Sequence, residues 1–240
     1  MHLPLHLEIS EQLRQHILDG KFLPGEQLPS EHQLMLEFAV SRITARRAIA
    51  NLIQQGLVTS YQGKGVFVKE QQKVMYSLSS PMILFEEDMA RQGFSSSIQN
   101  LVFESILAPE DIRTRLQLRQ GSKVYLQKKL LLLDGVPVAV DVTYLLHRFG
   151  KTCADELQQR MTFPTLEQNQ VPVDRIEATL ECTHANHEIS EYLNVPLGNP
   201  LLVYCYTAYT RNGKPILCGE ALSRGDRLCY SVTITKDRIK

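Results

Sequence analysis

The most informative stretch of the sequence is residues 41–68, SRITARRAIANLIQQGLVTSYQGKGVFV. Ser41 can cap a helix that runs to Gln55, and Gly56 ends this helix. The apolar face of the helix carries Ala45, Ala48, Ile49 and Leu52. Two short alternating segments follow around Gln62-Gly63-Lys64-Gly65, and they predict a β-hairpin.

Two more helices are predicted before this stretch. The first begins after Pro4, where apolar residues start to recur every four positions, and it ends at Gly20. These apolar positions are Leu5, Ile9, Leu13 and Ile17. Ser30, followed three residues later by Gln33, forms a capping box for a short second helix. The apolar contacts expected from the second helix are Leu34, Leu36 and Phe38. The second and third helices predict a helix-turn-helix, and the added hairpin makes it a winged helix.

Charge is balanced over the whole chain but uneven along it. Lys and Arg number 26, and Asp and Glu also number 26, which excludes a histone-like protein. Between Glu37 and Glu70, however, the sequence has no acidic residue. The basic residues of this window are Arg42, Arg46, Arg47, Lys64 and Lys69. Because the window covers the predicted third helix and wing, it predicts contact with duplex DNA, where cations release counterions and arginines reach guanine edges.

Length and composition favour two folded domains in one chain. The 240 residues exceed the usual size of a single domain, and 43% hydrophobic residues are typical of a folded protein. Since no apolar run approaches the roughly 20 residues that cross a bilayer and the first residues lack a secretory signal, we expect a cytoplasmic protein with no membrane partner. The five cysteines lie in the second half without C-x-x-C spacing, which argues against a disulfide framework.

The remaining residues divide into a linker and a second domain. Residues 70–80, EQQKVMYSLSS, are polar and serine-rich and predict an interdomain linker. Within residues 81–240, strand-like text flanks Asp134-Gly135 and Asn212-Gly213, so two hairpins are predicted. The segments RIEATLEC and CYSVTIT add further strands, which gives an α+β domain with a largely antiparallel sheet flanked by helices. The absence of βαβ alternation and of a phosphate loop in the sequence argues against a nucleotide-binding α/β fold.

Three motifs in the first seventy residues stand at a characteristic spacing. They are LPSE at 28–31, VSR-x-T at 40–44 and QGKG at 62–65. Residues 5–69 thereby resemble the N-terminal domain of the GntR family of bacterial transcription regulators. The resemblance implies that Arg42, Thr44 and Arg46 contact an operator from the recognition helix and that Gln62 and Gly63 form the wing tip. Our further candidates for DNA contact are His32, Arg47 and Lys64.

The second domain carries softer motifs. They are G-x-x-x-S from Gly93, D-G-V-P from Asp134, L-N-V-P-x-G-x-P-L-L from Leu193, and RGDR from Arg224. Residues 80–236 thereby resemble the effector domain of the HutC subgroup, called UTRA, whose fold is similar to that of chorismate lyase. The resemblance implies a small cytoplasmic metabolite as effector and a homodimer formed by this domain.

Two departures from that subgroup bear on the effector. Where relatives often carry Arg-x-Arg before the first hairpin, this sequence has Lys129 and Leu131, so one cation remains and a ligand with at most one anionic group is predicted. Leu217 and Gly219 stand where Glu and Ser are frequent, which predicts a less polar pocket. Our candidate effector-binding residues are Lys129, Asp141, Thr143, Tyr144, Ser97, Arg224 and Tyr230. The alternative for the first two is a solvated lysine that pairs with the aspartate.

The sequence therefore predicts a ligand-responsive regulator, a repressor that binds a pseudo-palindromic operator as a homodimer and needs no cofactor. A redox- or metal-responsive regulator on the same scaffold is a second interpretation. It would use Cys218 and Cys229, or the cluster of Cys182, His184, His187 and Glu188. An enzyme of chorismate-lyase-like fold is a third, although the sequence contains no nucleophile elbow, no HExxH motif and no paired carboxylates on text typical of a cleft.

Overall fold

A computed structural model of the chain describes residues 4–69, 73–78, 84–171 and 173–234. The chain divides into two compact units, of which the first comprises residues 1–72 with 194–196 and the second the rest. Among the described residues, no helix is long and apolar enough to cross a membrane.

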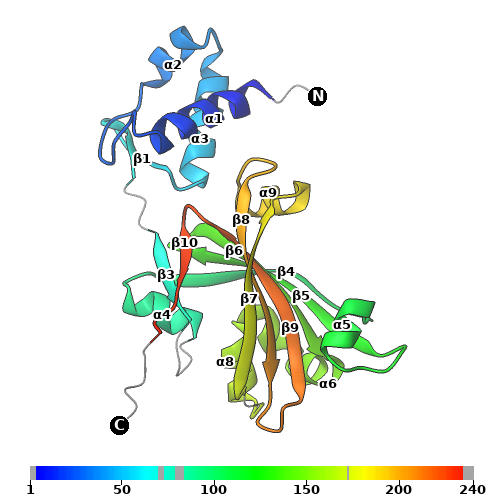
Figure 1. The fold of residues 1–240 in the computed structure, drawn as a ribbon. Coiled ribbons are helices and arrows are strands. Elements are labelled where there is room, and N and C mark those ends of the chain that lie inside the picture. Colours follow the sequence, from blue (N-terminus) through cyan, green and yellow to red (C-terminus); the bar gives the residue numbers. More distant parts are fainter. Residues whose placement is uncertain (1–3, 70–72, 79–83, 172, 235–240) are drawn as a thin grey trace, which may run out of the picture. The chain divides into compact units, whose positions relative to one another are not determined.

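The first unit is a winged helix. Its elements are α1 (Leu5–Leu18), α2 (Glu31–Glu37), α3 (Arg42–Gln54), β1 (Val58–Tyr61) and β2 (Gly65–Val68), shown in blue to cyan in Figure 1. The predicted capping box at Ser30 and the cap at Ser41 are both confirmed. The predicted packing of Leu36 is wrong, since its side chain is 72% exposed. Leu34 already faces the core, and two residues further along a helix turn a side chain by about 200°.

The second unit is built on a six-stranded antiparallel sheet. Its strands, in spatial order, are β4 (Ser96–Leu107), β5 (Lys123–Leu133), β6 (Val136–Leu146), β9 (Pro215–Arg224), β8 (Pro200–Tyr209) and β7 (Arg175–His184). Both predicted hairpins are confirmed, because β5 pairs with β6 and β8 pairs with β9 across their turns. The α+β class predicted for this part of the chain is therefore confirmed.

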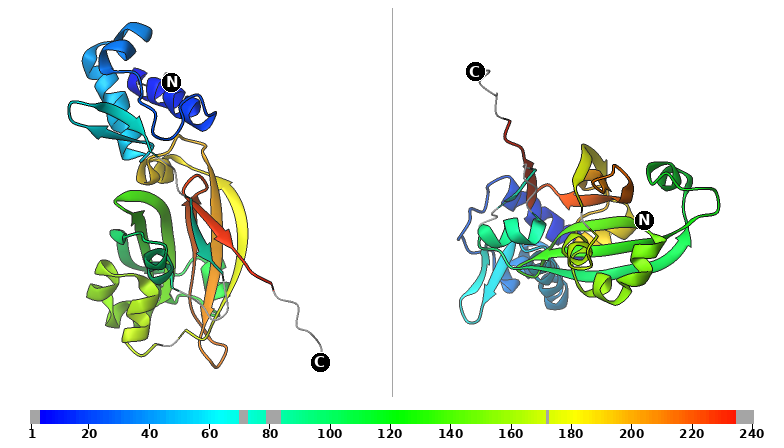
Figure 2. Two further views of the ribbon diagram at one scale, coloured as in Figure 1. Left: turned by 90° about the vertical axis from the view of Figure 1, so that its left-hand side faces the viewer. Right: turned by 90° about the horizontal axis from the view of Figure 1, so that it is seen from below.

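Among its described residues, the second unit also has six short helices. They are α4 (Phe85–Arg91), α5 (Glu110–Arg115), α6 (His147–Thr152), α7 (Ala154–Gln159), α8 (Thr162–Gln168) and α9 (His187–Leu193). Figure 2 shows the yellow-green helices α6 to α8 gathered beside the green strands. Hydrogen bonds from β5 to the backbone at Leu157 and Arg160 attach α7 and the start of α8 to this face of the sheet.

The predicted linker is partly a strand of the second unit. β3 (Val74–Ser77) pairs in parallel with β10 (Leu228–Ser231), so residues close to the winged helix in sequence are hydrogen-bonded to the end of the chain. Alternation within VMYS buries Val74 and exposes Met75, which the polar composition of residues 70–80 had obscured. Positions 70–72 and 79–80 of the predicted linker lie outside the described residues.

Candidate DNA-binding surface and effector cavity

Arg42 and Arg46 lie on one face of α3, because residues four apart share a face of a helix. Their side chains are 78% and 80% exposed, and both are directed toward Glu31 at the start of α2. The Nε atom of Arg42 lies 3.0 Å from Glu31 Oε2, and the Nε atom of Arg46 lies 3.9 Å from Glu31 Oε1. One carboxylate therefore orients both arginines.

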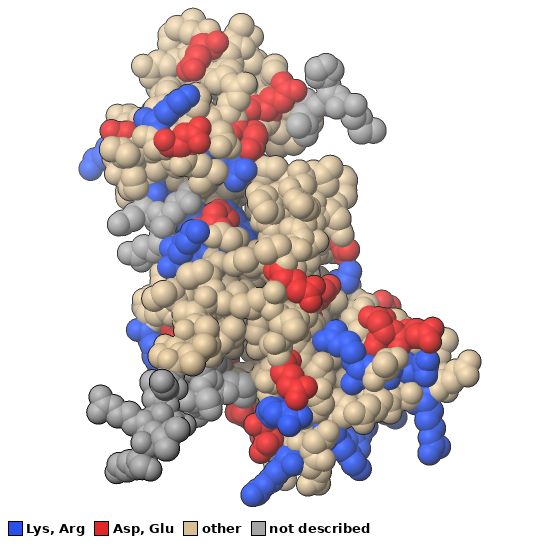
Figure 3. All heavy atoms as spheres, viewed as in Figure 1, with Lys and Arg blue, Asp and Glu red and all other residues tan. Residues whose placement is uncertain are grey.

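The other predicted DNA-contacting residues of the helices are placed as follows. The hydroxyl of Thr44 lies 2.9 Å from that of Ser41, so the Thr44 side chain takes part in the cap of α3. His32 and Arg47 are exposed. On the face of the first unit shown in Figure 3, basic and acidic groups are interspersed.

The wing is held by a side chain from the loop before α2. Gln27 donates a hydrogen bond of 2.9 Å from Nε2 to the carbonyl oxygen of Lys64. Gly65 has a φ of +112°, a backbone conformation that favours glycine, and a Cβ atom there would displace the Gln27 amide from its present position. The three tip residues Gln62, Gly63 and Lys64 are exposed.

Glu31 is a residue of this candidate surface that the sequence reasoning missed, since it lies before the acid-free window. Replacing it with Gln should lower the ratio of specific to non-specific DNA affinity by about two- to fivefold, the size of an exposed ion pair worth up to about 1 kcal/mol. Specific affinity should fall because the two arginines are no longer oriented by Glu31. Non-specific affinity should rise because a negative charge that repels the DNA phosphates is removed. Competition binding with operator and random duplex measures the ratio. Glu37→Gln, at the far end of α2, is the matched control, and an unchanged ratio for Glu31→Gln would refute the orienting role.

In the second unit, the strand register brings candidate effector residues into rows. Lys129 pairs with Asp141, Asp141 with Ala221, and Ala221 with Tyr204, so these four residues form one cross-strand row on β5, β6, β9 and β8. All four line a cavity of about 90 Å³ that is partly open to solvent. The antiparallel register thus gathers at one cavity residues from two hairpins that are far apart in the sequence.

Lys129 lies at the inner end of the cavity. Its side chain is 1% exposed, and its Nζ atom donates to the carbonyl oxygen of Arg160 at 2.5 Å and to Thr162 Oγ1 at 3.1 Å. Burial lowers the pKa of the ammonium group to about 8, although the charges of Asp141 and Glu86 act in the opposite direction. Within the described residues, the two hydrogen-bond acceptors of the ammonium are neutral, so one of its three N–H groups remains for a ligand.

Asp141 is held away from Lys129, although the two residues are cross-strand partners. Its Oδ1 is hydrogen-bonded to the Tyr206 hydroxyl at 2.7 Å, and its Oδ2 to the Thr143 hydroxyl at 2.7 Å. Burial raises the pKa of the Asp141 carboxyl, against the lowering effect of these hydrogen bonds and of Lys129. The predicted alternative, a solvated lysine paired with this aspartate, is therefore wrong.

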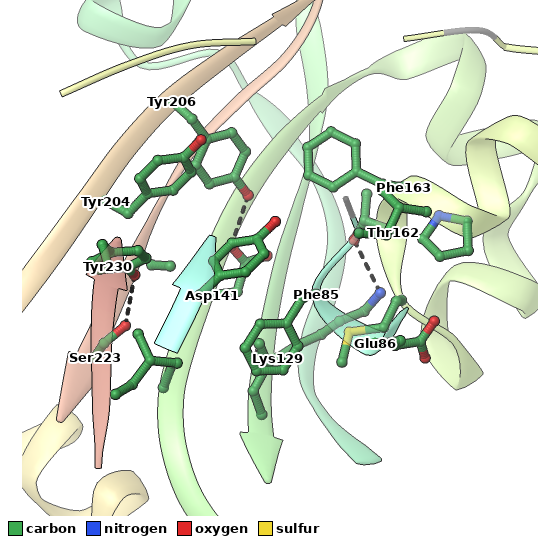
Figure 4. A pocket seen from close by; sticks show the side chains of 18 residues that line it. Phe85, Glu86, Lys129, Asp141, Thr162, Phe163, Tyr204, Tyr206, Ser223 and Tyr230 are labelled. Atoms are coloured by element: carbon green, nitrogen blue, oxygen red, sulfur yellow. Dashed lines mark hydrogen bonds between the residues drawn. The ribbon is translucent and has the colours of Figure 1, made fainter. Parts of the chain in front are cut away.

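Aromatic side chains form most of the cavity wall. They are Tyr76, Phe85, Phe163, Tyr204, Tyr206 and Tyr230. Tyr204 stacks on Tyr206 with ring centroids 5.5 Å apart and on Tyr230 at 5.4 Å. Figure 4 shows Asp141 between these rings and Lys129, with Glu86 and Phe85 from α4 on the near side. The wall suits a flat apolar body, and the polar groups suit one charged end.

The predicted effector residues divide between the cavity and other places. Lys129, Asp141 and Tyr230 line the cavity, and the buried Thr143 lies directly behind Asp141. Tyr144 points to the opposite face of the sheet, because alternate residues of a strand face opposite sides, and it packs beside Val124 and Cys218. Tyr144, Ser97 and Arg224 are not among the residues that line the cavity. Ser97 is exposed on β4, and Arg224 is buried at the end of β9, where it pairs with Asp226 of the following turn.

The sequence reasoning missed most of the aromatic wall. The missed residues are Tyr76, Phe85, Glu86, Thr162, Phe163, Tyr204 and Tyr206. They come from β3, α4, α8 and β8, so no local pattern unites them. Only the alternation of Tyr204 and Tyr206 within β8 marks two of them as sharing one face of a sheet.

Gly219 makes room for the Tyr206 hydroxyl. It lies between Thr143 and Tyr206 in the register, and a Cβ atom there would collide with the carbonyl oxygen of Val142 and lie 3.0 Å from the Tyr206 oxygen. Gly219→Ala should therefore destabilise the second unit by about 1–3 kcal/mol, the cost of overpacking a close-packed core. Near-ultraviolet circular dichroism of tyrosine during thermal unfolding measures this loss. Gly225→Ala, where the nearest atom lies 3.9 Å away, serves as control; equal melting of both variants would contradict the prediction.

The cysteine and histidine cluster does not converge. His187 pairs with Glu191 at 3.4 Å, and Glu188 pairs with Lys128 at 2.7 Å. Among the described residues, no group of three His, Cys, Asp or Glu side chains is arranged to hold a metal ion. Burial raises the pKa of the Cys218 thiol to about 11, which opposes the thiolate form that oxidation requires.

Comparison with known proteins agrees with this architecture. The family model described as the UTRA domain matches residues 91–228, and the model described as bacterial regulatory proteins, gntR family, matches residues 5–68. The HTH-type transcriptional repressor NagR of Bacillus subtilis is 26% identical over 231 residues, which cover 95% of this chain and 93% of NagR. The histidine utilization repressor of Pseudomonas putida is 25% identical over 229 residues, which cover 93% and 89% of the two chains.

Among solved structures, that of PhnF from Mycobacterium smegmatis has a TM-score of 0.67 with 21% sequence identity and covers 95% of this chain and 100% of its own. At this identity the likeness shows a shared fold. The two family models together match parts of both units, and the model of the first unit describes bacterial regulatory proteins. The chain belongs to the GntR family of bacterial regulatory proteins, in the group that carries a UTRA domain.

Proposed function

We propose that this protein is a cytoplasmic repressor that binds a pseudo-palindromic operator as a homodimer and whose DNA affinity changes when a small metabolite enters the aromatic cavity. The observation that carries the DNA-binding part is the pair of exposed arginines on α3, oriented by Glu31 beside a glycine-containing wing. The relatives named as repressors over nearly the whole chain support the repressor role.

The recognition helix presents both polar and apolar groups. Arg42 and Arg46 read or position the major groove, where an arginine guanidinium bonds guanine edges. The Thr44 side chain stays close to the start of α3. From there it contacts the sugar-phosphate backbone of the DNA. Ile43 is 67% exposed on the same first turn and offers an apolar contact for a thymine methyl group. His32, Arg47 and the wing residues Gln62, Gly63 and Lys64 contact the flanking phosphates or the minor groove.

Selection of bound sequences from a random duplex library by the full chain tests this function. A two-fold symmetric consensus is expected, because a symmetric dimer places two recognition helices on two half-sites. A consensus without two-fold symmetry would refute the dimeric operator, and recovery of no consensus would refute sequence-specific binding.

The homodimer is proposed to form along β7. Within the described residues, β7 is an edge strand that pairs on one side with β8, and nine of its ten residues are exposed. Such an edge presents unpaired N–H and C=O groups that another strand can pair with. The exposed Leu180 at its centre adds apolar contact area.

Leu180→Glu should convert the dimer to monomers, because two like charges then meet near the centre of the paired edges. Sedimentation equilibrium measures the change in mass. Leu197→Glu places the same charge on another exposed leucine and should leave the mass unchanged. A Leu180→Glu protein that remains fully dimeric would exclude β7 as the interface.

A further inference from the structure

Three side chains at the cavity, Asp141, Thr143 and Tyr206, form a closed triangle of contacts between their oxygen atoms. Tyr206 lies 2.7 Å from Asp141 Oδ1, Thr143 lies 2.7 Å from Asp141 Oδ2, and the Thr143 and Tyr206 hydroxyls lie 2.8 Å apart. All three distances are those of hydrogen bonds between oxygen atoms. Each contact therefore requires a hydrogen atom between its two oxygens.

Counting hydrogens distinguishes the two protonation states of Asp141. With an ionised carboxylate, the triangle holds two hydroxyl hydrogens for three contacts, so one pair of oxygens would meet without a hydrogen between them. With a protonated carboxyl, Asp141 donates to Tyr206, Tyr206 donates to Thr143, and Thr143 donates back to Asp141. Three donors then satisfy three acceptors in one ring, and no charge is buried.

The surroundings favour the neutral acid. Asp141 is half-buried in the cavity wall, and this burial raises its pKa as noted above. The titratable and charged groups that face it are Lys129 on β5, Glu86 on α4, Tyr76 on β3, Tyr204 and Tyr206 on β8, Tyr230 on β10 and, behind the sheet, Glu220 on β9. Burial raises the pKa of Tyr230 to about 12 and raises the pKa of Glu86 and Glu220. The tyrosines thus stay neutral at physiological pH.

A neutral ring leaves Lys129 without a buried counterion. Within the described part of the chain, neither Asp141 nor Glu86 forms an ion pair with it, and its acceptors are a carbonyl and a hydroxyl. Glu86 is partly exposed, where solvent screens its charge. Since a buried charge is stabilised by a partner of opposite sign, the inner end of the cavity favours an anionic group.

We propose that Asp141 carries a proton in the effector-free protein, as one of three donors in a ring with Thr143 and Tyr206, and that the effector is a small organic monoanion with a flat apolar body whose anionic group binds Lys129. This inference rests on the proposed function of the cavity as the effector site. It assigns Asp141 the role of a neutral hydrogen-bonding group, and it disfavours cations and sugar phosphates, which carry the wrong charge or two negative charges.

Asp141→Asn tests the proton without any effector, because an asparagine amide both donates and accepts and so reproduces the ring of the neutral acid. In wild type, the folded carboxyl binds its proton up to a higher pH than the unfolded one. Stability is therefore lost as the pH rises above the unfolded pKa of about 3.9, by up to tenfold in the unfolding equilibrium constant per pH unit. The amide does not titrate, so the variant should gain stability relative to wild type between pH 5 and pH 7.

Infrared difference spectra of wild type minus Asp141→Asn at pH 7 provide a direct readout. The carbonyl stretch of a protonated carboxylic acid is expected in the difference, since all other carboxyl groups cancel. A carboxylate band in its place, or a stability difference that is flat or reversed with pH, would overturn the protonation. Neither measurement depends on operator binding. A result that contradicts protonation of Asp141 would therefore leave the proposed function unaffected.

The charge class of the effector is tested with two ring compounds of matched size, benzoate and benzylammonium. Millimolar benzoate should raise the melting temperature of wild type and of Lys128→Met, whose lysine faces the other side of β5 and pairs with Glu188, but not of Lys129→Met. Stabilisation by benzylammonium, equal stabilisation of Lys129→Met by benzoate, or no effect of benzoate on wild type would overturn the monoanion. Operator binding is measured on the same preparations. A wild-type protein that does not bind operator would refute the proposed function instead.

Discussion

Arg46→Ala is expected to abolish specific operator protection while leaving the oligomeric state unchanged. The loss of one arginine contact to a base costs about 1–3 kcal/mol at each half-site. A homodimer loses the contact twice, which amounts to about 30-fold to 25,000-fold in affinity. Arg46 is well suited to this role because its side chain is exposed and already oriented by Glu31. Footprinting over a range of protein concentrations, with sedimentation equilibrium on the same samples, measures both quantities.

Arg47→Ala provides the contrast for this experiment. Arg47 follows Arg46 directly, and its side chain points about 100° away around α3. If it contacts phosphate alone, its loss weakens binding to all sequences alike and reduces the salt dependence by about one charge. An Arg46→Ala protein that protects the same site at wild-type concentrations would refute the recognition role of α3 as assigned.

Arg224→Met is expected to destabilise the second unit by about 3–5 kcal/mol, the cost of breaking a buried ion pair. The Arg224 side chain is 2% exposed, and its Nη2 atom lies 2.7 Å from Asp226 Oδ2 while its Nε atom lies 3.2 Å from Oδ1. Nη1 also donates to the carbonyl oxygens of Pro137 at 3.3 Å and Leu193 at 3.4 Å. The substitution therefore leaves a carboxylate and two carbonyl groups without their donor.

The effect of Arg224→Met should depend on pH in a defined direction. Burial acts to raise the pKa of Asp226, but the hydrogen bonds and charge of Arg224 outweigh it, and the pKa is lowered. A lowered folded pKa gives stability that is present above the unfolded value of about 3.9 and is lost as the pH falls through the folded value. The difference between wild type and variant should thus shrink in acid.

Tyrosine circular dichroism during thermal unfolding follows this transition, because the chain has no tryptophan and Tyr61 is the only tyrosine among residues 1–72. Arg211→Met, at an exposed turn, is the control and should melt like wild type. If Arg224→Met melted at the wild-type temperature while losing its response to an effector, Arg224 would belong to the binding site, as the sequence had suggested.

The winged helix could be predicted from sequence because its signals are local. The capping box at Ser30, the cap at Ser41 and the turn around Gly63 each involve residues within a few positions of one another. The hairpins of the second unit were equally accessible, since Asp134-Gly135 and the alternation beside it specify both the turn and the pairing of β5 with β6.

The cavity could be predicted only in part. Lys129 and Asp141 were candidates because they stand at positions where the resemblance to the UTRA domain implies ligand-binding residues, and the hairpin register places them opposite each other. Tyr76, Phe163 and Tyr206 belong to segments whose placement depends on pairing between distant strands and on helices that cover the sheet. Tyr144 was predicted to bind the effector because it is close to Asp141 and Thr143 in the sequence. Successive residues of β6 face opposite sides of the sheet, so Tyr144 lies on the other face.

The linear order of residues established the fold class and the acid-free window and supplied the candidates for DNA contact, because caps, turns and charge runs act over a few positions. In the folded unit, α2 packs against the start of α3 and brings Glu31 next to Arg42 and Arg46. These two arginines of the acid-free window therefore share a carboxylate from outside it. Folding also separated Lys129 from its cross-strand partner Asp141 by giving each its own hydrogen-bond partners. Charge and protonation in a buried site depend on which distant groups desolvate and hydrogen-bond a side chain, and those neighbours are set by strand register and packing.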